Sequence, residues 1–160
     1  MDFKLIQQVK VLNGRGCISQ IGEMLKESGY KKAFIVTTKG RRKLAEKIGE
    51  ILDKNAIASV IFDKVLPDPP SDIVEEGAKY CKSENCDCVV AVGGGSSIDC
   101  AKGINILRFN EGSIIDYTTK AMNKCEGLIT VPTTSGTGSE LSNGAIITDS
   151  KTGAKLPVLC

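Results

Sequence analysis

The sequence predicts a doubly wound α/β fold, in which helices cover both faces of a mostly parallel sheet. Short apolar runs rich in β-branched residues alternate with helical patterns, and strands separated by helices pair in parallel through right-handed crossovers. One apolar run, residues 88–92, ends in the glycines and hydroxyl residue of 93–96, and a helical pattern follows at once. A second loop rich in glycine and hydroxyl residues, 132–140, follows the apolar run 128–131.

The first part of the chain predicts two strands and two helices. Residues 3–9 alternate apolar and polar side chains, as an edge or half-buried strand does. Residues 18–26 carry an apolar stripe at helical spacing, and Gly29 is placed to end that helix. Residues 33–36 form a short apolar strand, and 41–52 place leucine or isoleucine at every fourth position, which predicts an amphipathic helix.

The second half continues the alternation. Residues 58–62 form the next strand, and three prolines between 67 and 70 make a rigid connection. Ser71 is a good N-cap for a helix that reaches residue 80. Residues 88–92 form the central strand, and its helix spans 97–107. Two later strands are expected at 128–131 and 145–148, whereas the apolar end of the chain receives no element.

Length and composition fit one globular domain, residues 1–160, long enough to bury a proper core. The net charge of +2 gives no reason to expect nucleic acid or an anionic membrane as a partner, and 4% aromatic residues argue against a base-stacking surface. No signal-peptide pattern and no membrane-spanning run is visible, so we expect a cytoplasmic protein.

Seven cysteines are expected to be reduced thiols, because their number is odd and the pattern is α/β. Cys81, Cys86 and Cys88 form one cluster, which is either a soft-metal site or a packing feature. Packing is the favoured interpretation, because the chain has no histidine and no second cysteine pair at zinc spacing. Cys100 is expected to be a small buried helix residue.

Three loops fall on one edge of the predicted sheet, since the carboxyl ends of parallel strands share an edge. Besides the two glycine loops, residues 37–40 follow the strand 33–36. Glycines permit sharp turns and close approach of a ligand, and a helix N-terminus favours a phosphate. Two such loops after two strands predict a dinucleotide site.

The motifs at these loops resemble those of the iron-dependent (group III) alcohol dehydrogenases. The matching segments are VTT at 36–38, VLPDP at 65–69, GGGSSIDCAK at 93–102, PTTSGTGSE at 132–140, and IITD at 146–149 followed by Lys155. Two long loops at the correct separation are far more specific than one. Over nearly all 160 residues the chain is similar to the family's N-terminal, Rossmann-like NAD(P)-binding domain.

The resemblance implies an oxidoreductase. In that family a hydride passes between NAD or NADP and a primary alcohol or its aldehyde. A separate helical C-terminal domain holds iron, occasionally zinc, through an aspartate and three histidines. This chain has no histidine, so no catalytic residue and no metal ligand is carried over. We expect the cofactor-binding half of an alcohol dehydrogenase, inactive alone, that forms a homodimer through its N-terminal strand.

The resemblance also places a set of residues at the cofactor. They are Thr38, Asp68, Gly94, Gly95, Ser96, Asp99, Thr133, Thr134, Thr137, Ser139 and Lys155. The first glycine loop would present backbone N–H groups and a hydroxyl to the pyrophosphate. The hydroxyls of the second loop would line the pyrophosphate and the nicotinamide.

Some of these residues have a simpler interpretation. Asp99 and Lys102 lie three apart on one helix, and a local ion pair without ligand contact is nearly as good an interpretation. Ser139 has the chemistry of a helix cap. Glu140 is a motif residue with an expected structural role, and Lys155 fits a solvated surface position as well.

Thr38 bears on the choice of cofactor. Many NAD-preferring members of the family have an aspartate here, which bonds the ribose hydroxyls and repels a 2′-phosphate. This chain has a neutral threonine followed by Lys39, Arg41 and Arg42, so we lean towards NADP. The alternative is a solvated basic helix start. Asp68 replaces an asparagine that is usual in the family.

Three alternatives stay open. Glycerol dehydrogenase and dehydroquinate synthase belong to the same superfamily, although the loop TTSGTGSE at 133–140 favours the alcohol dehydrogenase branch. A free-standing, non-catalytic nucleotide-binding module is favoured by the absence of histidine. A flavodoxin-like α/β domain without dinucleotide specificity is the third alternative, and only the match to the family motifs argues against it.

Overall fold

The apolar runs of the sequence form the four strands of one parallel sheet. The computed structural model describes residues 9–122 and 124–159. Its strands are β1 (Lys32–Val36), β2 (Ala58–Phe62), β3 (Cys88–Gly93) and β4 (Leu128–Pro132), in the spatial order β2-β1-β3-β4. All three neighbouring pairs run parallel. The predicted parallel α/β fold is therefore confirmed.

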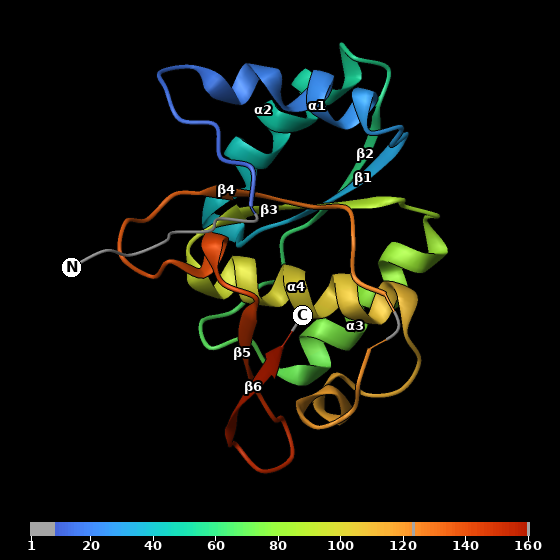
Figure 1. The fold of residues 1–160 in the computed structure, drawn as a ribbon, viewed down its shortest axis with the longest axis vertical. Helices are drawn as coiled ribbons and strands as arrows, with labels where there is room; N and C mark the ends of the chain where they lie inside the picture. The colour runs from blue at the N-terminus through green and yellow to red at the C-terminus, as the bar shows by residue number, and fades with distance from the viewer. Residues whose placement is uncertain (1–8, 123, 160) are drawn as a thin grey trace, which may run out of the picture.

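Helices cover both faces of this sheet, with α1 and α2 on one side and α3 and α4 on the other (Figure 1). Their bounds are α1 (Ile21–Glu27), α2 (Arg42–Asp53), α3 (Ser71–Ser83) and α4 (Gly95–Phe109). Short 3-10 turns lie at Cys17–Gln20, Lys39–Arg41, Ile114–Thr118 and Ser139–Leu141.

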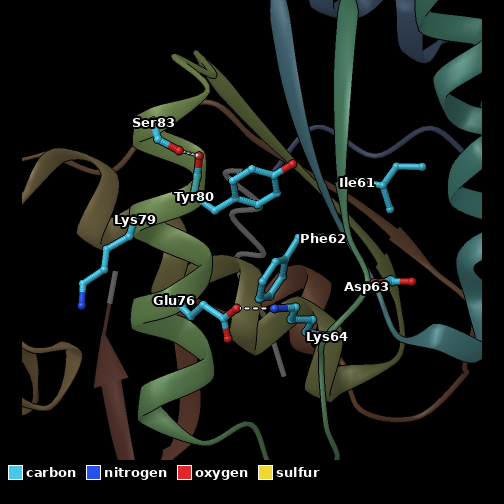
Figure 2. Close-up of a pocket in the computed structure, with 8 residues that line it drawn as sticks. All are labelled: Ile61, Phe62, Asp63, Lys64, Glu76, Lys79, Tyr80 and Ser83. Atoms are coloured by element: carbon cyan, nitrogen blue, oxygen red, sulfur yellow. Dashed lines mark hydrogen bonds and ion pairs between the residues drawn. The ribbon is translucent and has the colours of Figure 1, made fainter.

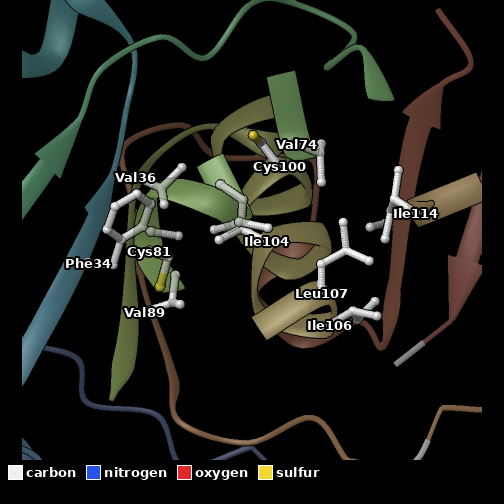
Figure 3. Close-up of a cluster of buried hydrophobic side chains, with 14 of the residues drawn as sticks. Phe34, Val36, Val74, Cys81, Val89, Cys100, Ile104, Ile106, Leu107 and Ile114 are labelled. Atoms are coloured by element: carbon white, nitrogen blue, oxygen red, sulfur yellow. The ribbon is translucent and has the colours of Figure 1, made fainter. Parts of the chain in front are cut away.

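Strand alternation divides the core into two clusters, because successive side chains point to opposite faces. Phe34 and Val36 of β1 pack with Ile104 on the face of α3 and α4 (Figure 3). Ile35 packs with Ile48 on the face of α1 and α2. All residues of β3 are buried, as expected of a central strand covered on both sides.

The end of the chain differs from the prediction. Residues 144–148 do form a strand, β5 (Gly144–Thr148), but it does not join the parallel sheet. It pairs antiparallel with β6 (Lys155–Leu159), a strand that the sequence did not reveal. The connection is tight, because the Gly153 N–H donates to the Asp149 carbonyl at 2.8 Å with φ of +73° at Gly153.

Several boundaries also shift. Pro70, not Ser71, is the N-cap of α3, and the Ser71 hydroxyl instead donates to Ser150 Oγ at 3.2 Å. The helix expected at 97–107 begins at Gly95, and the helix expected at 18–26 opens with a 3-10 turn. The strand expected at 3–9 lies outside the described residues, except for residue 9. Within the described part, no helix is long and apolar enough to cross a bilayer.

Candidate functional site

The candidate site forms where three loops leave the carboxyl ends of β1, β3 and β4. These strands are neighbours in the sheet, so the loops after them emerge side by side, as predicted. The buried hydroxyl of Thr37 donates to the Val92 carbonyl at 2.8 Å. This bond ties the end of β1 to the end of β3, just before the glycines.

The two glycine loops pack directly on each other. The Thr133 N–H donates to the Gly93 carbonyl at 2.9 Å. A Cβ atom at Gly94 would lie 3.0 Å from Thr134 Oγ1, and one at Gly95 would lie 3.2 Å from Thr137 Cγ2. The glycines of the first loop therefore admit the threonines of the second, a role that the sequence did not indicate.

Helix α4 begins inside this pair of loops with an open N-terminus. Its N-cap is Gly94, which has no side chain to cap the helix, and the first helical bond runs from the Ile98 N–H to the Gly94 carbonyl at 3.1 Å. The N–H groups of the first turn have no partner within a helix. A helix of 15 residues adds its dipole there, so the position suits an anion.

The predicted site residues Asp99 and Ser139 meet below the loops. Ser139 is 7% exposed, and its hydroxyl donates to Asp99 Oδ1 at 2.5 Å. Asp99 Oδ2 accepts the Ile146 N–H at 3.1 Å. The Asp99 carboxylate thus fastens both the end of the second loop and strand β5 to α4.

Lys102 reinforces the same junction from the interior, where it is 4% exposed. Its ammonium donates to the Ser139 carbonyl at 2.7 Å and to the Gly144 carbonyl at 2.6 Å. It also reaches the hydroxyls of Ser139 and Ser142 at 3.3 and 3.2 Å. The sequence offered one signal for this role, because the immediate neighbours of Lys102 are apolar or glycine, namely Cys100, Ala101, Gly103 and Ile104.

Asp68 and Lys155, both predicted at the cofactor, form an ion pair at 2.8 Å. Both side chains are more than half exposed. The proline segment is held beside the hairpin, since the Thr148 N–H donates to the Pro69 carbonyl at 3.0 Å and Pro70 forms a parallel bridge with Thr148. This long-range pairing brings the two residues together.

The basic residues after β1 are not equivalent. Thr38 is half-buried, and Lys39 and Arg41 are exposed. Arg42, in contrast, is bound to Asp63 at 2.8 Å and to Glu46 at 3.0 Å. Hydrogen bonding to Arg42 lowers the pKa of Asp63 from its ordinary value. The predicted set of three available cations is therefore reduced to Lys39 and Arg41.

The remaining predicted residues lie around the loop mouth. Gly94, Gly95, Ser96 and Thr133 are half-buried, whereas Thr134 and Thr137 are exposed. Cys100 is fully buried behind them, as expected, and burial raises its pKa to about 12. Glu140 Oε2 is buried without a hydrogen-bond partner among the described residues.

A separate groove of about 510 Å³ lies between β2 and α3 (Figure 2). Its lining includes Phe62 and Tyr80, and the ion pair of Lys64 with Glu76 lies across it. None of the predicted cofactor residues lines it. The groove is thus distinct from the loop mouth.

The residues that the structure describes do not fit a metal centre. Histidine is absent from the sequence. Within residues 9–122 and 124–159, no group of three or more histidine, cysteine, aspartate or glutamate side chains is arranged to hold a metal ion. Cys81, Cys86 and Cys88 are free thiols, and they do not form such a group.

Comparisons with known proteins converge on one family. A family model described as iron-containing alcohol dehydrogenase matches residues 8–160. The choline dehydrogenase of Bacillus subtilis is 42% identical over 146 residues, which cover 87% of this chain and 36% of that protein. The NAD-dependent methanol dehydrogenase of Bacillus methanolicus is 40% identical over 152 residues, which cover 91% of this chain and 39% of that protein.

Solved structures agree. The NADH-dependent butanol dehydrogenase A of Thermotoga maritima superposes with a TM-score of 0.91 at 32% identity, covering 99% of this chain and 41% of that one. The chain thus spans about two fifths of the length of the relatives it matches.

Proposed function

Because the chain belongs to the iron-containing alcohol dehydrogenase family, we propose that residues 1–160 form the dinucleotide-binding domain of an alcohol dehydrogenase. The observation that carries this proposal is the junction of the two glycine loops around the open N-terminus of α4. Free N–H groups, a helix dipole and several hydroxyls gather there. A pyrophosphate is the group that this chemistry binds best.

The proposed residue roles follow from that junction. The N–H groups of Gly95 and Ser96 hold the pyrophosphate, and the exposed hydroxyls of Thr134 and Thr137 contact the same group or the nicotinamide side. Thr133 lines the base of the mouth. Asp68 and Lys155 reach the cofactor from the hairpin side, where they already pair with each other.

In a longer protein of this family, we propose that the bound nicotinamide exchanges a hydride with a primary alcohol or its aldehyde. The metal that the family name implies would polarise the alcohol oxygen, but residues 9–122 and 124–159 supply no ligand set for it. The task of residues 1–160 is to bind and orient the dinucleotide. Alone, the chain should therefore bind cofactor without oxidising alcohols.

A titration tests this proposal. NADH is added to the 160-residue chain and followed by calorimetry or nicotinamide fluorescence, with ADP-ribose as a competitor for the pyrophosphate subsite. We expect saturable binding that ADP-ribose displaces, and no turnover of simple alcohols with or without added iron. If neither NADH nor NADPH binds at millimolar concentration, the proposal is wrong and an unspecific α/β domain is the better description.

For the cofactor we propose that NADP(H) is accepted at Thr38, in the absence of an aspartate that would repel a 2′-phosphate. Lys39 and Arg41 are the two exposed cations beside it. We further propose a cytoplasmic homodimer that forms through residues 3–9. Sedimentation of the chain with and without residues 1–9 tests this, because a discrete dimer should be lost in the shorter form.

A further inference from the structure

Three helices of this fold end in the same backbone arrangement. At the end of α1, the Tyr30 N–H donates to the Leu25 carbonyl, and at the end of α2 the Ile57 N–H donates to the Leu52 carbonyl, each at 3.0 Å. At the end of α3 the Cys86 N–H donates to the Cys81 carbonyl at 3.1 Å. A residue with positive φ precedes each donor, and it is Asn85 with φ of +54° at the third helix end.

This arrangement is the Schellman motif, which brings the side chains of the two bonded residues into contact. In α1 and α2 the contacting pairs carry no thiol: Leu52 and Ile57 both belong to the core on that face of the sheet, and Tyr30 packs against that core beside the core residue Leu25. In α3 the pair consists of two thiols, and both belong to the core on the opposite face. The motif needs only an apolar contact there, so the fold alone does not explain two cysteines.

The two thiols differ in exposure and in the direction of their pKa shifts. Cys81 is fully buried and points towards Phe34 and Val89 (Figure 3). Cys86 is 7% exposed, between the more accessible Asn85 and Asp87. A mutual hydrogen bond raises the pKa of Cys81 and lowers that of Cys86, and the Lys32 ammonium lowers the latter further.

We propose that Cys81 and Cys86 are a dithiol site that hydroperoxides oxidise reversibly to an intrachain disulfide. The Cys86 thiolate attacks the peroxide oxygen, the O–O bond breaks, and Cys86 becomes a sulfenic acid while the peroxide is reduced to water or an alcohol. The Cys81 sulfur then attacks the Cys86 sulfur. The S–S bond forms, the S–O bond breaks, and the thiol proton leaves with the hydroxyl as water.

The neighbouring cysteine supplies a matched control. Cys88 is also fully buried and only two residues from Cys86. It faces the opposite core cluster, however, and burial raises its pKa to about 12. It should therefore take no part in the reaction.

Peptide mapping tests the proposal on the unmodified chain. The protein is treated with hydrogen peroxide under native conditions, free thiols are blocked with iodoacetamide, and trypsin is added. Cleavage after Lys79, Lys82 and Lys102 separates Cys81, in peptide 80–82, from Cys86, in peptide 83–102. We expect these two peptides to be linked through Cys86, and the link to be lost on treatment with dithiothreitol.

The Cys88→Ala variant should keep this linkage, and Cys81→Ala should instead accumulate a Cys86 sulfenic acid that dimedone traps. The proposal is overturned if peroxide leaves both residues free for alkylation, or if the linkage in the native chain runs through Cys88 or Cys100. No step of this test depends on dinucleotide binding.

Discussion

The Asp99 carboxylate on α4 accepts a 2.5 Å hydrogen bond from the hydroxyl of Ser139, 40 residues further along the chain. Because the same carboxylate also accepts the Ile146 N–H, it fixes the end of one glycine loop to the helix that starts at the other. Asp99 therefore has two partners within the chain itself, the Ser139 hydroxyl and the Ile146 N–H.

This bond predicts that Asp99 and Ser139 act as a unit. We expect Asp99→Ala and Ser139→Ala each to lower the free energy of unfolding by about 1–3 kcal/mol, because each removes a charge-assisted hydrogen bond that joins the second loop to α4. In urea unfolding, the stability lost by the double variant should be smaller than the sum of the two single losses by more than about 0.5 kcal/mol. Additive losses would contradict the coupling. If Asp99 contacted the cofactor directly, Asp99→Ala would instead weaken NADH binding by the same factor whether or not Ser139→Ala is also present.

Lys102 should contribute to stability through the hydrogen bonds that its buried ammonium donates. Lys102→Met keeps the apolar stem but removes the ammonium that donates to the carbonyls of Ser139 and Gly144. We expect a loss of about 3 kcal/mol in the free energy of unfolding, together with faster proteolysis within residues 133–142. Lys43→Met, at an exposed position of α2, is the control and should change stability by less than about 0.5 kcal/mol.

Gly95→Val should weaken NADH binding at least about tenfold, equivalent to about 1.4 kcal/mol, because a side chain there occupies the approach to the open helix end. The structure adds a second possible cause, since the new Cβ would also press on Thr137. The Gly95→Val/Thr137→Ser variant removes the Cγ2 atom closest to the new Cβ but keeps the hydroxyl proposed to contact the cofactor, so calorimetry on it separates the two causes. We expect no recovery of affinity, and full recovery would show that the glycine serves only loop packing.

Thr38→Asp should shift cofactor preference towards NAD(H), by repelling the 2′-phosphate and by bonding the ribose hydroxyls. With native Thr38, a charge-assisted contact of about 1.5–3 kcal/mol would favour NADPH by about one to two decades. Higher salt should reduce that preference. Arg42→Gln is the control, since Arg42 already binds Asp63 and Glu46. Tighter binding of NADH than of NADPH at low salt would refute the proposal.

The Asp63–Arg42 ion pair should make the free energy of unfolding depend on pH. The pKa of Asp63 is lowered in the folded chain, so its contribution is fully present above the unfolded pKa of about 3.9 and is lost as the pH falls through the folded value. Urea unfolding at neutral pH should find Asp63→Asn less stable than the native chain. The difference should shrink as the pH is lowered below about 3.9, and a difference that does not shrink would point to packing instead.

The sequence by itself determined the parallel sheet, the glycine turn after β3 and the helix that follows it. These features rest on local signals, since an apolar run of five or six residues, three glycines and a helical stripe each constrain the backbone where they stand. Family motifs added the identity of the second loop.

Tertiary structure alone decided how these parts meet. Strand β6 forms because β5 offers it an antiparallel edge, and neither strand's composition specifies that partner. The sequence placed Asp68 and Lys155 far apart, and the hairpin unites them. Lys102 and Asp99 lie on one helix, yet their described bonds run to residues 139–146. Hydrogen bonds between distant segments depend on the packed arrangement of the whole chain, which no local pattern encodes.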